Sequence, residues 1–162
     1  MPIVDSRSRR TFLQRALALG IAGTVPLGRA WPLPGGREPQ VLTGTDFSLE
    51  IAEQPVHVLG GDVPATAING TVPGPVLRLR EGDTVTLRVT NRLRVPSSIH
   101  WHGLLVPAEM DGVPGLSFAG IPPGATYVYR FPVRQYGTYW YHAHTRFQEQ
   151  TGTYGSIFIE RR

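Results

Sequence analysis

The sequence has 162 residues, of which 41% are hydrophobic and 17% charged, a balance typical of one soluble globular domain. All 16 basic residues are arginine; five of them lie within residues 1–30, which leaves 11 basic and 11 acidic residues in the rest of the chain. This neutrality argues against nucleic acid or an anionic membrane as a partner, and the absence of cysteine excludes disulfide bonds and thiolate metal ligands.

Residues 1–30 have the features of an export signal. The sequence SRRTFLQ at residues 8–14 is a twin-arginine pattern, and an apolar stretch follows at residues 16–27. That stretch is shorter than the roughly 20 apolar residues that span a bilayer, so no permanent membrane helix is expected. Small residues before Trp31 predict cleavage after Ala30 and export to the periplasm by the twin-arginine route. The alternative is a disordered basic arm or an ordinary helix.

The remaining chain predicts a single all-β domain. Residues 31–45 are rich in proline and glycine and predict a flexible lead-in. From Asp46 onward apolar and polar residues alternate in short runs, which is typical of half-buried antiparallel strands. Turn signals such as Asn69-Gly70 separate these runs. We therefore expect a Greek-key β-sandwich of eight or nine strands over residues 46–162.

Four of the five histidines form two His-x-His pairs, His100-Trp101-His102 and His142-Ala143-His144. In a strand, residues two apart point to the same face about 6.5–7 Å apart, so each pair presents two neighbouring imidazoles. Imidazoles without carboxylates or thiolates in the same short motifs favour copper or zinc, and the spacing does not choose between these metals. A single His-x-His pair is more often a chance surface feature, but two pairs favour a metal site.

The neighbouring aromatic residues and the fifth histidine have simpler interpretations. Trp101, Trp140 and Tyr141 are expected to pack on the sheet rather than to carry electrons, because large aromatic side chains on strands usually pack. His57 stands alone in an apolar segment and is interpreted as an ordinary strand residue, not as a ligand.

Five segments together resemble the first domain of multicopper oxidases, most of all the bacterial copper-resistance members, which also carry a twin-arginine signal. The segments are residues 68–75, 80–83, 100–103, 110–115 and 137–144. The resemblance covers residues 46–160 in order. It implies a cupredoxin-like fold and copper as the cofactor.

The resemblance also implies a role for each site residue. His100 would bind a type 2 copper, His102 and His142 one copper of a type 3 pair, and His144 the other. Asp111 matches the acidic residue of the family's Asp-Gly segment, where it would assist proton delivery to oxygen. The alternative for Asp111 is a simple turn carboxylate before a glycine.

Complete members of this family carry eight histidines around three coppers and a cysteine-centred type 1 copper, and the missing ligands come from their last domain. We therefore expect this chain to act as the first domain of such an oxidase, completed by a C-terminal cupredoxin domain on the same or a separate chain. Oxygen reduction would then be coupled to oxidation of cuprous ion or phenols, and the chain alone would be inactive. One alternative is a non-catalytic periplasmic copper-buffering module, and another is a degenerate fragment that folds poorly because its inter-domain face is exposed.

Overall fold

The computed structural model describes residues 39–58, 60–116 and 118–162. The predicted export signal, residues 1–30, lies outside the described residues, as does the first part of the predicted lead-in. Within the described part of the chain, no helix has the length and apolar character needed to cross a membrane.

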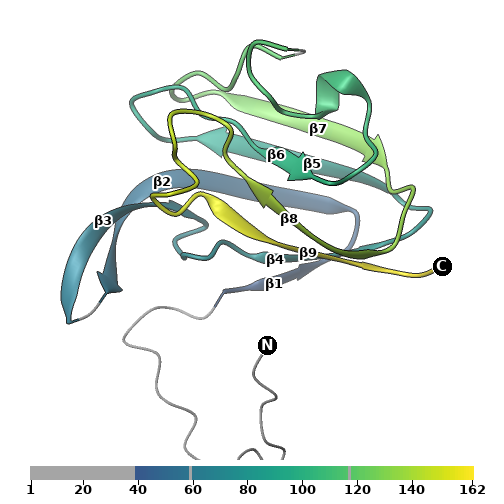
Figure 1. Cartoon of the computed structure of the whole chain (residues 1–162), viewed down its shortest axis with the longest axis horizontal. Helices are drawn as coiled ribbons and strands as arrows, with labels where there is room; N and C mark the ends of the chain where they lie inside the picture. The colour runs from purple at the N-terminus through teal and green to yellow at the C-terminus, as the bar shows by residue number, and fades with distance from the viewer. Residues whose placement is uncertain (1–38, 59, 117) are drawn as a thin grey trace, which may run out of the picture. The chain divides into compact units, whose positions relative to one another are not determined.

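The described residues form nine strands and one short 3-10 helix, so the predicted all-β class is confirmed (Figure 1). The elements are β1 (Val41–Thr43), β2 (Asp46–Val58), β3 (Gly61–Ile68), β4 (Val76–Arg80), β5 (Thr84–Asn91), β6 (His100–His102), η1 (Ala108–Met110), β7 (Thr126–Pro132), β8 (Gly137–His142) and β9 (Tyr154–Glu160).

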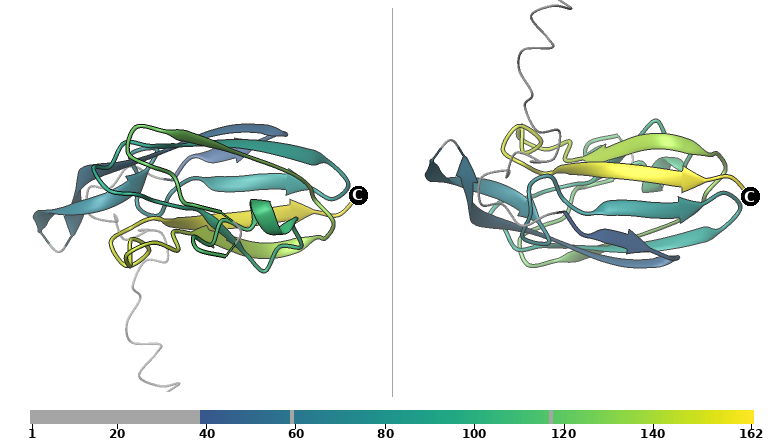
Figure 2. Two further views of the ribbon diagram at one scale, coloured as in Figure 1. Left: turned by 90° about the horizontal axis from the view of Figure 1, so that it is seen from above. Right: turned by 90° about the horizontal axis from the view of Figure 1, so that it is seen from below.

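The strands form two sheets. One has five strands in the order β1-β4-β9-β8-β6, and the other has four in the order β3-β2-β5-β7. The right view of Figure 2 shows β9 (yellow) beside β4, to which it pairs in parallel. Strand β6 pairs with β8 alone and is therefore an edge of its sheet.

Strand β1 corrects one prediction. Residues 31–45 were expected to form a flexible lead-in, but Val41–Thr43 form a strand that pairs in parallel with β4, with Val41 opposite Val76. The prediction is wrong for these three residues. The pairing partner lies far along the chain, so local proline and glycine content does not reveal it.

Alternate residues of both sheets contribute to one hydrophobic core. On β2, Phe47, Leu49 and Ile51 are buried, as the alternating pattern predicts. The ring of Trp101 on β6 meets the ring of Tyr129 on β7 edge-on, with 5.1 Å between centroids. Because β6 and β7 belong to different sheets, this contact joins the two layers.

Tyr141 on β8 is fully buried beside Trp101, and its hydroxyl donates a hydrogen bond of 2.7 Å to the carbonyl oxygen of Pro75. The predicted packing role of Trp101 and Tyr141 is therefore confirmed. Their inward orientation determines which side chains of β6 and β8 face outward.

Candidate metal centre

The two His-x-His motifs lie side by side on neighbouring strands. His100 is directly opposite His142, and His102 is opposite Trp140. Since Trp101 and Tyr141 point into the core, the strand alternation turns the histidines of β6 and β8 to the opposite face. The structure therefore brings the two motifs together, as the sequence predicts.

Three of the four histidines form a tight group. One ring nitrogen from each of His100, His102 and His142 lies within 4.8 Å of the others. The rings of His100 and His142 lie at the middle of the group, 5.5 Å apart. The His100 ring is 5.6 Å from that of His102 and 5.8 Å from that of His144, and the His142 ring is 5.4 Å and 6.0 Å from the same two.

Main-chain carbonyl groups orient two of these rings. The Nδ1 atom of His100 lies 2.8 Å from the carbonyl oxygen of Asp111, and the Nδ1 atom of His142 lies 2.9 Å from that of Ala143. A carbonyl oxygen only accepts, so in each neutral ring Nδ1 carries the proton and Nε2 keeps its lone pair. Hydrogen bonds of this kind characteristically orient metal-binding histidines.

The distance between His102 and His142 fits a shared metal ion. Two imidazole nitrogens bound to one metal at about 2.0–2.1 Å with a tetrahedral angle lie about 3.3 Å apart. The Nδ1 atom of His102 is 3.3 Å from the Nε2 atom of His142. These two nitrogens, with His100 beside them, therefore have the spacing and the chemistry to hold a copper ion.

Trp140 lies over this pair. Its ring stacks on His142 with 4.0 Å between centroids and a 16° interplanar angle, and it lies 5.0 Å from the ring of His102.

Burial lowers the pKa of His142, and the nearby His100 acts in the same direction, which favours the neutral, ligand-competent imidazole.

Trp140 shows where the sequence interpretation was incomplete. It was expected only to pack on the sheet, and it does pack on a histidine, yet it remains 41% exposed. Its position two residues before His142 was the available signal, because residues two apart share one face of a strand.

His144 lies beyond the tight group. It is two residues past the end of β8, and its ring centroid is 6.0 Å from that of His142. Its backbone N–H donates a hydrogen bond of 2.9 Å to Oγ of Ser98. The fourth histidine thus joins the cluster from the side opposite His102, next to His100 and His142.

Asp111 lies beside His100. Its carboxylate Oδ1 is 3.4 Å from Nδ1 of His100, farther than its own carbonyl oxygen at 2.8 Å. The next residue, Gly112, has a φ of 75° and lies so close to the chain at Ile99 that a Cβ atom would overlap the Ile99 carbonyl group. Glycine is therefore required for the turn that brings Asp111 to His100.

His57 contacts a residue outside this histidine cluster. It is on β2, opposite Asp62 of β3, and its Nδ1 atom is 3.0 Å from the Asp62 carboxylate. The expected strand position is confirmed.

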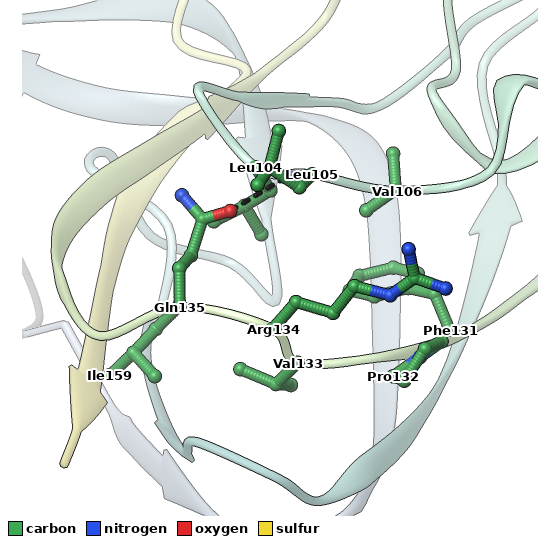
Figure 3. Close-up of a pocket in the computed structure, with 9 residues that line it drawn as sticks. All are labelled: Leu104, Leu105, Val106, Phe131, Pro132, Val133, Arg134, Gln135 and Ile159. Carbon is green, nitrogen blue, oxygen red and sulfur yellow. Dashed lines mark hydrogen bonds between the residues drawn. The ribbon is translucent and has the colours of Figure 1, made fainter.

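A shallow pocket lies next to the loop that follows β6 (Figure 3). Its lining is mostly apolar, and its polar side chains are Arg134 and Gln135. Gln135 accepts a hydrogen bond from the N–H of Leu105 and donates one to the carbonyl of Gly103. None of the four clustered histidines lines this pocket, so it is not part of the candidate metal centre.

Comparisons with known proteins agree with this geometry. Residues 50–162 match the family model of multicopper oxidases. Copper resistance protein A of Pseudomonas syringae pv. tomato is 56% identical over 160 residues, and that of Escherichia coli is 52% identical over 160 residues. These matches include 97% and 96% of this chain but 26% of each relative, so the chain spans about a quarter of their length.

The fold comparison points the same way. The crystal structure of a multicopper oxidase from Pseudomonas thermotolerans superposes with a TM-score of 0.71 at 37% sequence identity. The match covers 76% of this chain and 31% of that one.

Proposed function

Because the chain belongs to the multicopper oxidase family, we propose that it provides half of the histidine ligands of a three-copper cluster that reduces oxygen. The observation that carries this proposal is the tight group of His100, His102 and His142, with His144 beside it. Residues 46–162 form the copper-binding domain in this proposal.

Each histidine has a specific role. His102 and His142, whose nitrogens face each other at 3.3 Å, hold one copper of a type 3 pair. His144, on the other side of the cluster, holds the second copper of that pair. His100 binds the type 2 copper through Nε2, since its Nδ1 proton is engaged by the carbonyl of Asp111.

Copper supplies electron transfer to oxygen by alternating between its cuprous and cupric states. The chain supplies the fixed imidazoles and a nearby acid. The carboxylate of Asp111 is half-buried beside His100. In this proposal it delivers protons during oxygen reduction.

The other half of the cluster comes from a C-terminal cupredoxin domain, on the same chain or on a partner. The 26% coverage of copper resistance protein A supports this, as does the absence of cysteine, without which no type 1 copper can form. The complete oxidase acts on cuprous ion or phenols in the periplasm and contributes to copper resistance. Residues 1–30 are its twin-arginine signal, and replacing Arg9 and Arg10 with lysine is expected to retain the chain in the cytoplasm.

The test measures copper content and oxygen uptake of the purified chain with cuprous ion or a phenol as the electron donor. The chain alone is expected to bind copper and take up no oxygen. Adding the C-terminal domain of a copper resistance protein A, with its cysteine, is expected to start oxygen uptake. His142→Ala should abolish that uptake, whereas His57→Ala should leave it unchanged.

Copper binding that is insensitive to His142→Ala would contradict the proposal. Tight copper binding through the four histidines, without oxygen uptake under any pairing, would instead favour a periplasmic copper-buffering module. The exposure of His102 at the surface of the cluster is compatible with that second function.

A further inference from the structure

The pairing of β6 with β8 extends by one position beyond the strands themselves. His100 is opposite His142 and His102 is opposite Trp140, so the same register places Ser98 opposite His144. Strand β6 begins only at His100, so Ser98 is outside the strand. The two segments are still joined at this position, because the hydroxyl oxygen of Ser98 accepts a hydrogen bond of 2.9 Å from the backbone N–H of His144. A side chain therefore provides the acceptor that a strand carbonyl would otherwise provide.

Ser98 is itself firmly held. It is fully buried, and its Oγ lies 2.8 Å from Oγ1 of Thr145. The preceding residue, Ser97, exchanges two backbone hydrogen bonds with Ile121 and donates its hydroxyl proton to the side chain of Gln148. Gln148 in turn donates to the carbonyl of Pro96. The segment before β6 is thus clamped to the segment after β8.

The clamp matters most for His144. His100 and His142 have their rings oriented by carbonyl groups at Nδ1, but within the described residues neither ring nitrogen of His144 has a hydrogen-bond partner. Its ring position therefore depends on its backbone. The backbone hydrogen bond that joins His144 to the segment leading into β6, which carries His100 and His102, is the one that Ser98 accepts.

The turn after His144 makes this anchor more important. Arg146 and Phe147 both have positive φ values, 51° and 56°, which cost about 1–2 kcal/mol each for residues with a side chain. Such a turn persists only where surrounding contacts fix it. The Ser98–Thr145 and Ser97–Gln148 hydrogen bonds are contacts of this kind.

We propose that Ser98 is a positioning residue of the metal centre, whose buried hydroxyl sets the place of His144 relative to His100 and so controls the copper that His144 binds. This inference rests on the proposed function. It assigns to Ser98 an effect on one ligand only, since His100, His102 and His142 are held by other contacts.

A double-mutant cycle in the full chain, with cupric ion as the probe, tests this assignment. Binding is measured by chelator competition, and the copper environment by electron paramagnetic resonance. Ser98→Ala is expected to weaken copper binding about 10-fold or more, the usual effect of removing a group that orients a ligand. In the His144→Ala background the same substitution should have no further effect, because the residue through which Ser98 acts is gone.

Thr153→Val is the matched control. Thr153 is fully buried in the same loop region, and its hydroxyl donates to the carbonyl of Thr66. Its replacement removes a comparable buried hydrogen bond and is expected to leave copper affinity unchanged. An equal loss of affinity from Ser98→Ala in both backgrounds would mean a general structural role and overturn the proposal.

Hydrogen exchange in the unmodified chain provides a second test that does not depend on a variant folding. The amide of His144 should be protected as strongly as that of Ala143, which donates to the carbonyl of Thr153. Free exchange at His144 would overturn the inference.

The copper-binding variants separate this inference from the proposed function. If His144→Ala weakens copper binding and Ser98→Ala does not, only the role of Ser98 fails. If no histidine variant changes copper binding, the proposed function fails with it.

Discussion

The Nδ1 atom of His102 lies 3.3 Å from the Nε2 atom of His142, although the two residues are 40 positions apart in the chain. They meet because β6 pairs with β8 in a register that puts His100 opposite His142. The separation equals that expected for two imidazoles on one metal ion. The histidine cluster is therefore arranged for metal binding by the backbone pairing itself.

Removal of either facing histidine should weaken copper binding strongly. We expect His102→Ala or His142→Ala to lower copper affinity by more than about 100-fold, since loss of a ligand exceeds the 10–100-fold effect of losing a group that orients one. Competition with a chelator of known affinity measures this. His57→Ala is the control, because His57 pairs with Asp62 on the β2–β3 hairpin. Equal losses in all three variants would contradict the site.

Copper bound to this chain should lack the intense blue colour of a copper–thiolate centre. The sequence contains no cysteine, so no thiolate is available to a copper ion. The visible absorption spectrum of the copper-loaded chain gives the answer. A strong blue band in the purified chain would show that the ligand set is different from the four histidines.

Gly112→Ala should destabilise the fold far more than Gly115→Ala. Both glycines have positive φ values, 75° and 85°, but a Cβ atom at Gly112 would overlap the Ile99 carbonyl, whereas one at Gly115 meets nothing within 4 Å. We expect losses of unfolding free energy of about 3 kcal/mol or more for Gly112→Ala and about 1 kcal/mol for Gly115→Ala. Urea denaturation of both variants measures the difference. Equal losses would mean that the positive φ values alone, and not the overlap with the Ile99 carbonyl, determine the loss of stability.

The buried phenol of Tyr129 should make stability fall at high pH. Burial raises the pKa of Tyr129 well above its ordinary value. Below about pH 10 both folded and unfolded chains keep the proton, so the contribution is fully present. Above that pH the unfolded chain loses the proton first, and stability falls by about 1.4 kcal/mol per pH unit.

Comparison with Tyr129→Phe isolates this effect. The difference in unfolding free energy between the two chains should be constant from pH 7 to 9 and should change by the stated slope above pH 10. A difference that stays constant to pH 11 would mean that Tyr129 ionises equally in both states.

Several features of the site could be predicted from the sequence because they depend on local periodicity. Alternation of apolar and polar residues identifies strands, and a spacing of two puts His100 and His102 on one face. The turn glycine after Asp111 is also visible locally, as part of an Asp-Gly pair. These properties require no knowledge of which strands are neighbours.

The sequence alone determined the residue types of the cluster and their grouping into same-face pairs. Only the tertiary structure decided that His142 joins His100 and His102 while His144 stands beyond them, that Ser98 lies opposite His144, and that Val41–Thr43 form a strand. These facts follow from hydrogen bonds between segments far apart in the chain. The alternating pattern determines which face of a strand is buried and so restricts its register. Which strands become neighbours depends on the packing of the whole fold.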